Sequence, residues 1–338
     1  MALNCDIAIV GGGVLGLCVA VELTVRGHDV VVLDPGRPNA SSIAAGMIAP
    51  AMESVLDRVR PERARLLREA ADLWPDFARR TSIDLKPGPA VWRGDKADAL
   101  AETARGLGFF AEVRDDAVWT EDRQVEPGPA LDALRRLAGR ILDRHAVSIT
   151  RPKDRWTVMT GMEAVAAKSV VLATGAAEAL EGLPDPVRIL VDAVVPIRGQ
   201  IGWTSAMTEG VVRGAGGYVA PMGEGSVIGA SMGAGRRDLT VDILEAQALL
   251  AVAERLTTQA LVARPVDWRV GIRGATEDGL PLAGPSGEPG LHLALAPRRN
   301  GWLLGPLVGQ IVADGIEGRP PAKQAPALDP RRFSRRAG

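Results

Sequence analysis

The sequence predicts an α/β protein with two domains, one built on parallel strands and the other on a mostly antiparallel sheet. Near the N-terminus, an apolar strand, a glycine-rich turn, an apolar helix and a second apolar strand follow one another between Asp6 and Asp34. Between Pro196 and Ser231, short stretches of alternating polar and apolar residues are typical of antiparallel strands. The 338 residues, 46% of them hydrophobic, are enough to build two domains with buried cores.

The N-terminal unit carries a glycine pattern with a chemical purpose. Gly11 permits a tight turn, Gly13 lets a pyrophosphate approach the backbone, and Gly16 lets the helix lie close to the sheet. The positive end of the helix favours an anion, and Asp34 can accept hydrogen bonds from ribose hydroxyls. A dinucleotide site is therefore predicted at this crossover; the alternative is an ordinary turn without a ligand. The expected contacts are Gly11, Gly13, Val14, Leu15, Gly16, Asp34 and Pro35.

The remaining elements follow from hydrophobic periodicity and from proline and glycine positions. Besides the first unit (strand 7–10, helix 14–25, strand 30–33), we expect helices at residues 61–80, 97–107, 129–143, 240–256 and 301–315. We expect strands at residues 146–150, 155–160, 168–172, 196–203, 217–221, 226–231 and 291–296.

Charge and cysteine content exclude several classes of protein. Forty Lys and Arg residues balance 41 Asp and Glu residues, so the net charge of -1 favours neither nucleic acid nor an acidic membrane as a partner. Cys5 and Cys18 are expected to be small apolar core residues, with no disulfide or metal role. The N-terminus lacks the pattern of a signal peptide and no apolar run reaches membrane-spanning length, so a cytoplasmic protein is expected. Whether it forms a homo-oligomer is left open.

Seven separated motifs occur in an order known from one family. They are the opening glycines, Ser41 to Met47, Leu172 to Ala176, Pro196 to Gln200, Gly217 to Pro221, Gly271 to Arg273 with Asp278 to Pro281, and Arg299 to Gly301. Together they resemble the FAD-dependent D-amino acid oxidase superfamily, and most of all its bacterial glycine oxidase branch. The resemblance spans nearly the whole chain. It implies a Rossmann-like FAD-binding domain interleaved with a substrate domain built on a mostly antiparallel sheet.

The resemblance assigns further residues to FAD. The loop of Ser41 to Met47 would wrap the pyrophosphate and pass the flavin ring, although the two serines could instead cap a helix. The helix after Asn300 would direct its positive end at the flavin and stabilise the reduced form, or it could be an ordinary helix start. The residues implied are Ser41, Ser42, Ala45, Gly46, Met47, Thr174, Gly175, Arg299, Asn300, Gly301 and Trp302.

The resemblance also implies a substrate site. Arg273 matches an arginine that holds the substrate carboxylate, a role for which the guanidinium fork is well suited; a solvated surface arginine is the alternative. Tyr218, the single tyrosine, matches a substrate-side tyrosine, or it simply packs on its strand. Arg273 and Tyr218 are thus the predicted catalytic pair, and Arg299 and Met232 are further predicted substrate contacts.

The expected reaction needs no general base. The three histidines, His28, His145 and His292, have flanks typical of structural or surface positions. Family chemistry transfers hydride from the substrate α-carbon to flavin N5, after which the imine hydrolyses and oxygen is reduced to hydrogen peroxide. Related sarcosine oxidases attach FAD to a cysteine late in the chain, and none occurs there in this sequence, so the FAD is expected to be noncovalent.

Departures from the family pattern affect the substrate prediction. The stretch Gly214 to Gly217 has small residues where glycine-oxidising relatives have bulkier ones, Met222 replaces a usual arginine, and Ala296 to Arg298 replaces a usual Gly-His. We take the small residues to leave room for an N-substituted glycine or an apolar D-amino acid. Glycine remains in the substrate class, with a small-molecule amine and oxygen as the only expected partners.

Three other functions remain open. The chain could be a D-amino acid dehydrogenase that passes electrons to a quinone or protein acceptor, a flavin- or nucleotide-binding protein without catalysis, or a nicotinamide dehydrogenase. In the favoured interpretation, residues 1–85, 128–195 and 270–338 form the FAD-binding domain, and residues 86–127 and 196–269 form the substrate domain.

Overall fold

The computed structural model describes residues 2–161, 163–177, 179–257 and 264–333 and divides into two compact units. Unit 1 comprises Met1–Asn39, Leu131–Ile197 and Ile272–Gly338, and unit 2 comprises Ala40–Ala130 and Arg198–Gly271. The predicted domain boundaries differ from this division mainly at residues 40–85. That segment belongs to unit 2 because its strand β3 (Met47–Ile48) pairs with β6 (Ala117–Gln124). Which unit serves the cofactor and which the substrate stays a prediction.

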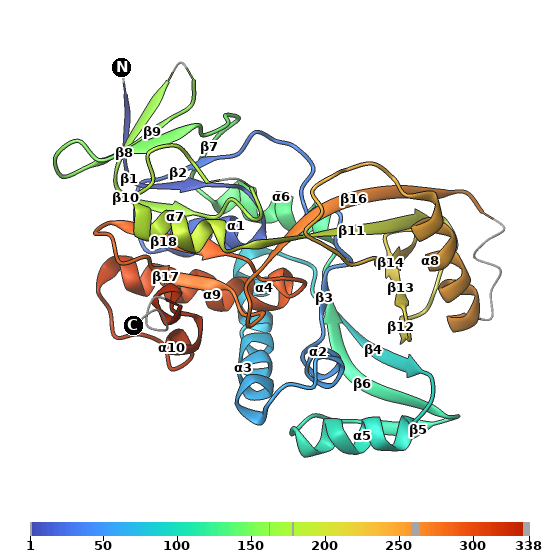
Figure 1. Ribbon diagram of the computed structural model, residues 1–338. Helices are drawn as coiled ribbons and strands as arrows, with labels where there is room; N and C mark the ends of the chain where they lie inside the picture. The colour runs from blue at the N-terminus through green and yellow to red at the C-terminus, as the bar shows by residue number, and fades with distance from the viewer. Residues whose placement is uncertain (1, 162, 178, 258–263, 334–338) are drawn as a thin grey trace. The chain divides into compact units, whose positions relative to one another are not determined.

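Unit 1 is built on a twisted sheet with the order β17-β18-β10-β1-β2-β7 (Figure 1). The strands from β18 to β7 run parallel, whereas β17 pairs with β18 in the antiparallel sense. Two further strands, β8 and β9, extend the sheet beyond β10. The strands are β1 (Leu3–Val10), β2 (Val30–Leu33), β7 (Arg140–Leu142), β8 (Ser148–Thr150), β9 (Trp156–Met159), β10 (Ala164–Leu172), β17 (Leu282–Pro285) and β18 (Leu291–Leu295).

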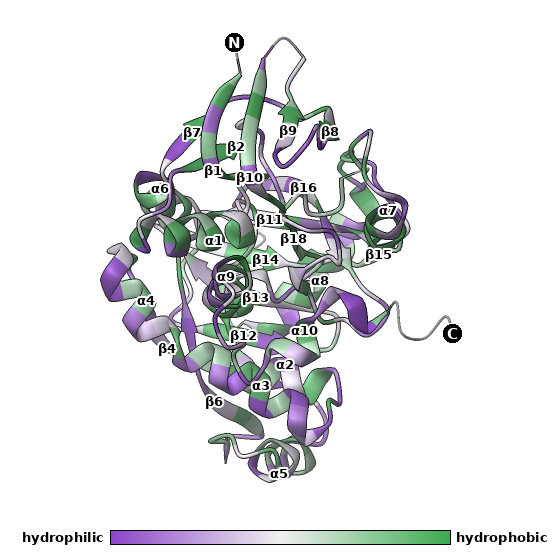
Figure 2. Cartoon of the chain, turned by 90° about the vertical axis from the view of Figure 1, so that its left-hand side faces the viewer, coloured by the Kyte–Doolittle hydropathy of each residue, from purple (hydrophilic) through white to green (hydrophobic). Residues whose placement is uncertain are grey.

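Two apolar helices pack on each other in unit 1: α1 (Val14–Val25) and α9 (Gly301–Glu317). Both are coloured predominantly hydrophobic in Figure 2, and most of their residues are buried. Small residues make the contact close: a Cβ on Gly305 or Gly309 would lie 2.9 Å from an atom of Cys18. Both cysteines are buried, as expected for small apolar core residues. Shorter helices of this unit are α7 (Asp185–Asp192), α10 (Ala325–Leu328) and the 3₁₀ turn η2 (Pro330–Arg332).

Unit 2 contains the predicted mostly antiparallel sheet, with the order β15-β11-β14-β13-β12-β4-β6-β3. The pairing of β12 with β4 is parallel. The strands not yet bounded are β4 (Lys86–Arg93), β5 (Glu112–Arg114), β11 (Val195–Thr204), β12 (Val211–Gly214), β13 (Gly217–Met222), β14 (Gly225–Gly229), β15 (Gly233–Ala234) and β16 (Val266–Ala275). The helices are α2 (Pro50–Leu56), α3 (Pro61–Asp72), α4 (Trp74–Thr81), α5 (Ala97–Gly106) and α8 (Ile243–Leu256). The elements α6 (Pro127–Leu137), β11 and β16 cross the unit boundary.

Two helix predictions are wrong in part. The predicted helix 61–80 is broken at Leu73, where α4 begins with Pro75 in its first turn, because proline cannot donate the hydrogen bond that would continue α3. The predicted helix 129–143 ends at Leu137, and β7 follows as a parallel partner of β2. Gly139, at φ 78°, makes this reversal possible.

No helix within the described part of the chain combines the length and apolarity needed to cross a membrane.

Candidate cofactor and substrate site

The first glycine turn of unit 1 is packed so closely against neighbouring backbone that it has no room for side chains at Gly11 and Gly16. Gly11 has φ 110°, and a Cβ there would overlap the backbone carbonyl of Ala173, at the end of β10. A Cβ on Gly16 would overlap the carbonyl oxygen of Gly11. The helix α1 then begins after Gly13, which has no side chain to cap the first N–H groups, and the first turn carries no acidic residue. A backbone cradle with an uncapped positive helix end fits a pyrophosphate group.

A second helix begins beside the first. A Cβ on Gly301 would lie 3.2 Å from Cγ1 of Val14, so α1 and α9 start next to each other although nearly 290 positions separate them. Further along both helices, Gly305 and Gly309 of α9 lie against Cys18 of α1, so the two helices run parallel. The turn before α9 is strained: Ala296 and Arg298 have φ 59° and 53°, in the left-handed region that non-glycine residues avoid. Such strain is concentrated at functional sites.

Asp34 lies at the end of β2 and is 6% exposed. Its carboxylate accepts the Gly36 N–H at 3.3 Å and pairs with Arg135 of α6 at 2.7 Å. It also lies against Gly12, where any Cβ would overlap it. An ionised carboxylate has about four acceptor positions, so these two partners leave acceptor capacity for ribose hydroxyls. The sequence analysis missed Arg135, because 101 positions separate it from Asp34.

Two more predicted segments meet at this edge of the parallel strands. Gly175, with φ 67°, follows β10, and its carbonyl oxygen would lie 3.1 Å from a Cβ on Gly274. The Gly274 carbonyl in turn accepts the Arg298 N–H at 2.8 Å. The half-buried Arg273 therefore belongs to a strand whose end is attached to both the β10 turn and the turn before α9. The unit 1 residues predicted for cofactor and carboxylate come together at the carboxyl ends of β1, β2, β10 and β18, where open α/β sheets bind ligands.

In unit 2, the loop from Ser41 to Met47 is held by backbone contacts. A Cβ on Gly46 would overlap the carbonyl oxygen of Val125, whose N–H binds the Gly46 carbonyl at 3.0 Å. Gln124 donates from Nε2 to the carbonyls of Ala45 and Pro221, at 2.9 and 2.8 Å. It thus connects this loop to β13, the strand of Tyr218.

The capping alternative for Ser41 and Ser42 is wrong. Both serines lie in a turn, and the next helix begins only at Pro50.

Tyr218 lies between β12 and β14, directly opposite Arg213 on one side and Gly229 on the other. Its ring and the side chain of Met47 pack against one apolar cluster of unit 2. The cluster consists of Ala45, Ala90, Ile201, Val211, Ala220 and Val227. Two predicted contacts are therefore brought together around one core. Met232, a third, is 46% exposed.

The glycines before Tyr218 do not open space for a substrate, contrary to the expectation from sequence. A Cβ on Gly214 would overlap Leu256 of α8, and one on Gly216 would lie 3.2 Å from Val252 of the same helix. A Cβ on Gly217 would lie 2.5 Å from the carbonyl oxygen of Gly229. These glycines permit α8 and β14 to pack closely, so the size argument for a larger substrate does not hold.

A buried ionic cluster close to this region was missed. Arg213 donates from Nη1 to Glu53 of α2 at 3.0 Å and from Nη2 to Sδ of Met47 at 3.2 Å. Asp122 of β6 is electrostatically coupled to both charged groups. The side chains of Glu53, Arg213 and Asp122 are 5 to 7% exposed. Residue alternation along β6 could have indicated that Asp122 is buried, because Asp122 lies on the same face of the strand as the buried Val118 and Thr120.

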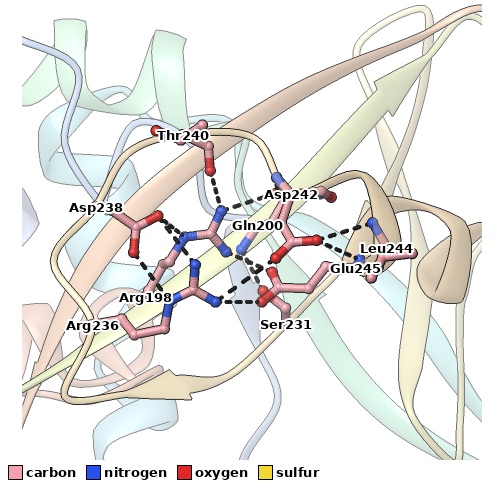
Figure 3. Close-up of polar contacts among 9 residues, drawn as sticks. All are labelled: Arg198, Gln200, Ser231, Arg236, Asp238, Thr240, Asp242, Leu244 and Glu245. Carbon is pink, nitrogen blue, oxygen red and sulfur yellow. Dashed lines mark hydrogen bonds and ion pairs between the residues drawn. The ribbon is translucent and has the colours of Figure 1, made fainter.

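A second network gives a structural role to the Pro196 to Gln200 motif (Figure 3). Arg198 is fully buried and donates to Asp238 at 3.0 Å, to Glu245 at 2.6 Å and to the Thr240 carbonyl. Gln200 exchanges hydrogen bonds with the backbone of Asp242, while its own N–H binds Ser231 Oγ at 2.9 Å. The segment from Ser231, next to Met232, to the start of α8 is therefore fastened to β11.

Comparison with known proteins bears on the sequence and the fold as a whole. The profile of the family described as FAD dependent oxidoreductase matches residues 6–315. The chain is 30% identical over 355 residues to a glycine oxidase of Geobacillus kaustophilus (strain HTA426), covering 92% of this chain and 93% of the relative. The crystal structure of glycine oxidase from Geobacillus kaustophilus superposes with a TM-score of 0.83 at 28% identity, covering 97% of this chain and 98% of that one.

Another relative is longer than this chain. A tRNA 5-methylaminomethyl-2-thiouridine biosynthesis bifunctional protein MnmC of Caulobacter sp. (strain K31) is 29% identical over 359 residues. The match covers 98% of this chain but only 58% of that protein. Two further bifunctional relatives are matched over 52% of their length, so the chain spans little more than half of the first curated relatives.

Proposed function

Because the chain belongs to the family of FAD-dependent oxidoreductases and takes FAD as its cofactor, we propose that it is an amine oxidase for glycine-type substrates. The substrate class is an N-substituted glycine, glycine or a D-amino acid, and the final electron acceptor is oxygen. When bound, FAD supplies the two-electron acceptor for oxidation of the substrate bond between α-carbon and nitrogen.

The observation that carries the proposal is the convergence of four turns in unit 1. The turns at Gly11, Asp34, Gly175 and Gly301 all follow parallel strands, and the first and last of them start the adjacent helices α1 and α9. The helix ends would hold the anionic parts of FAD, and Asp34 would hold its ribose. The backbone approaches at Gly11 and Gly16, which any Cβ would fill, support the same assignment.

Substrate orientation is assigned to two side chains. Arg273 would bind the substrate carboxylate through both guanidinium nitrogens, and Tyr218 would orient the amine end, with Arg299 and Met232 as further contacts. Within the described residues we assign no general base. His292 is buried, and burial lowers the pKa of its imidazole to about 4, so it is neutral near pH 7. The substrate must then arrive with a neutral amine, or lose its proton to water.

Neither cysteine is suited to a covalent link with FAD. Burial is the main cause that raises the pKa of the Cys5 thiol to about 11, and burial also raises the pKa of Cys18. Both thiols therefore stay protonated and unreactive at neutral pH. This supports noncovalent FAD, which denaturation should release into solution.

The first experiment is purification followed by a substrate screen. The protein should be yellow and should release hydrogen peroxide under air with at least one N-substituted glycine, glycine or D-amino acid. Anaerobic bleaching by a substrate without peroxide under air would favour the dehydrogenase. A yellow protein that no substrate bleaches would favour a binding function. The nicotinamide alternative is wrong, because the chain belongs to a family of FAD-dependent oxidoreductases.

The carboxylate assignment is tested by Arg273→Ala. Loss of one member of a buried ion pair costs roughly 3–5 kcal/mol, which corresponds to about two to four decades in substrate affinity. FAD content should be retained. Arg269→Ala, on the same strand but 59% exposed and paired with Asp267, is the matched control and should bind substrate normally. An Arg273 variant with a normal Michaelis constant and turnover would exclude this role.

A further inference from the structure

Unit 2 buries three ionisable side chains from three elements that the sequence keeps far apart. Glu53 comes from α2, Arg213 from β12 and Asp122 from β6. Glu53 and Arg213 form a direct ion pair, at 3.0 Å. Arg213 is thus paired with one buried carboxylate and exerts an electrostatic effect on a second, that of Asp122.

The hydrogen bonds of this cluster are incomplete. Within the described residues, neither carboxyl oxygen of Asp122 has a hydrogen-bond partner, and neither does Nε of Arg213. A buried ionised carboxylate without a partner is costly, whereas a protonated one is much less so. The Nε–H of Arg213 is a hydrogen-bond donor and the carboxyl oxygens of Asp122 are acceptors, so the cluster contains an unused donor together with unused acceptors.

The other end of Arg213 reaches the segment assigned to FAD. Its Nη2 contacts Sδ of Met47 at 3.2 Å. In the β12–β13 pairing, Arg213 stands directly opposite Tyr218, and directly opposite residues of an antiparallel pair project to the same face. A movement of Arg213 would therefore break its contact with Met47 and change the surroundings of Tyr218.

We propose that Asp122 is protonated in the active enzyme, and that its ionisation draws Arg213 away from Glu53 and Met47. The Glu53–Arg213–Asp122 cluster thereby makes the position of the Met47 segment depend on pH. This inference rests on the proposed function, since it gives the Met47 segment a role beside the cofactor. Asp122 is a positioning residue that acts through Arg213.

The charges around Asp122 agree with a proton held near neutral pH. Burial is the largest cause and raises the pKa of Asp122 to about 7; Arg213 lowers it, Glu53 raises it and Arg123 of the same strand lowers it. Gly88, its partner on β4, contributes no side chain. Below about pH 7, Asp122 is neutral and Arg213 stays bound to Glu53 and Met47. Above this pH, the ionised carboxylate of Asp122 competes with them for Arg213.

The test measures the FAD dissociation constant of the apoprotein from about pH 6 to about pH 8.5, by quenching of FAD fluorescence. If FAD binding raises the pKa of Asp122 by about one unit, the dissociation constant of the wild type should rise about tenfold across this range. Asp122→Asn, which stays neutral and keeps the shape of the side chain, should bind FAD tightly with a flat profile. Asp95→Asn, at an exposed position of the same unit, is the matched control and should behave as wild type.

Glu53→Gln provides a second, independent measurement. Removal of the neighbouring negative charge should lower the pKa of Asp122, so the weakening of FAD binding should begin at a lower pH than in the wild type. A purely structural role of Glu53 would weaken binding equally at every pH. A flat wild-type profile, or the same alkaline weakening in Asp122→Asn, would overturn the proposal. Because FAD binding is measured without turnover, failure to oxidise any amine would count against the proposed function alone.

Discussion

The ring of Tyr218 lies over Gly229, its direct partner on β14, and a Cβ at Gly229 would overlap the Tyr218 ring and hydroxyl. The position of the single tyrosine thus depends on the absence of a side chain one strand away. Gly229 was not among the residues that the sequence marked for function, because a glycine in a strand carries no chemistry of its own.

Gly229→Ala should therefore displace Tyr218 without removing it. A shift of about 1 Å in a group that orients substrate can cost about 100-fold in rate, so we expect a loss of that order in kcat/KM with normal FAD content. Steady-state kinetics and the visible spectrum measure the two quantities. Gly106→Ala, in α5 of the same unit where a Cβ meets open space, is the control and should be fully active. Equal activity of the two variants would contradict the assigned role of Tyr218.

Gly11→Ala should abolish FAD binding. The substitution imposes a Cβ where the carbonyl of Ala173 already lies, at a φ of 110° that alanine rarely adopts. The turn must shift, and with it the start of α1. The purified variant should be colourless and should not take up added FAD. Gly128→Ala, at an open position in α6, should remain yellow; a yellow Gly11→Ala protein would show that the turn is not part of the cofactor site.

Arg198→Met should destabilise the protein strongly. Its fully buried guanidinium binds Asp238, Glu245, Gln200 and the Thr240 carbonyl, so the substitution removes all of these contacts at once. Urea unfolding measures this loss. Arg236 contacts the same two carboxylates but is 43% exposed, so Arg236→Met should change the unfolding free energy far less. Similar losses in both variants would mean that burial of Arg198 contributes little.

Asp122→Asn should stabilise the protein in alkaline solution. The pKa of Asp122 in the folded protein is raised to about 7 from an ordinary value of 3.8. The contribution of this group to the unfolding free energy is therefore fully present below pH 3.8 and is lost as the pH rises through about 7. Between about pH 5 and about pH 8 the wild type should lose about 2 to 3 kcal/mol of unfolding free energy from this group. The variant should lack this loss. Thermal unfolding of both proteins over that range gives the answer, and a difference independent of pH would refute the assignment.

The sequence by itself determined the features that depend on short segments. The strand, glycine turn, helix and strand from residue 3 to residue 34 form as predicted, because hydrophobic period and glycine spacing act within one crossover. The seven motifs were likewise sufficient to identify the family and FAD. The strand at 140–142 was missed, because its apolar residues fit a helix equally well until β2 is present to pair with them.

Only the tertiary structure decided which distant groups meet. Arg213 and Glu53 are separated by 160 positions, and no local pattern links them. The glycines at 214–217 illustrate the same limit: their small size suggested room for substrate, but α8 and β14 occupy that space. Local sequence specifies what a segment can form, whereas the packing of the whole chain specifies which charges are buried together and which gaps are filled, because those energies arise between elements and not within them.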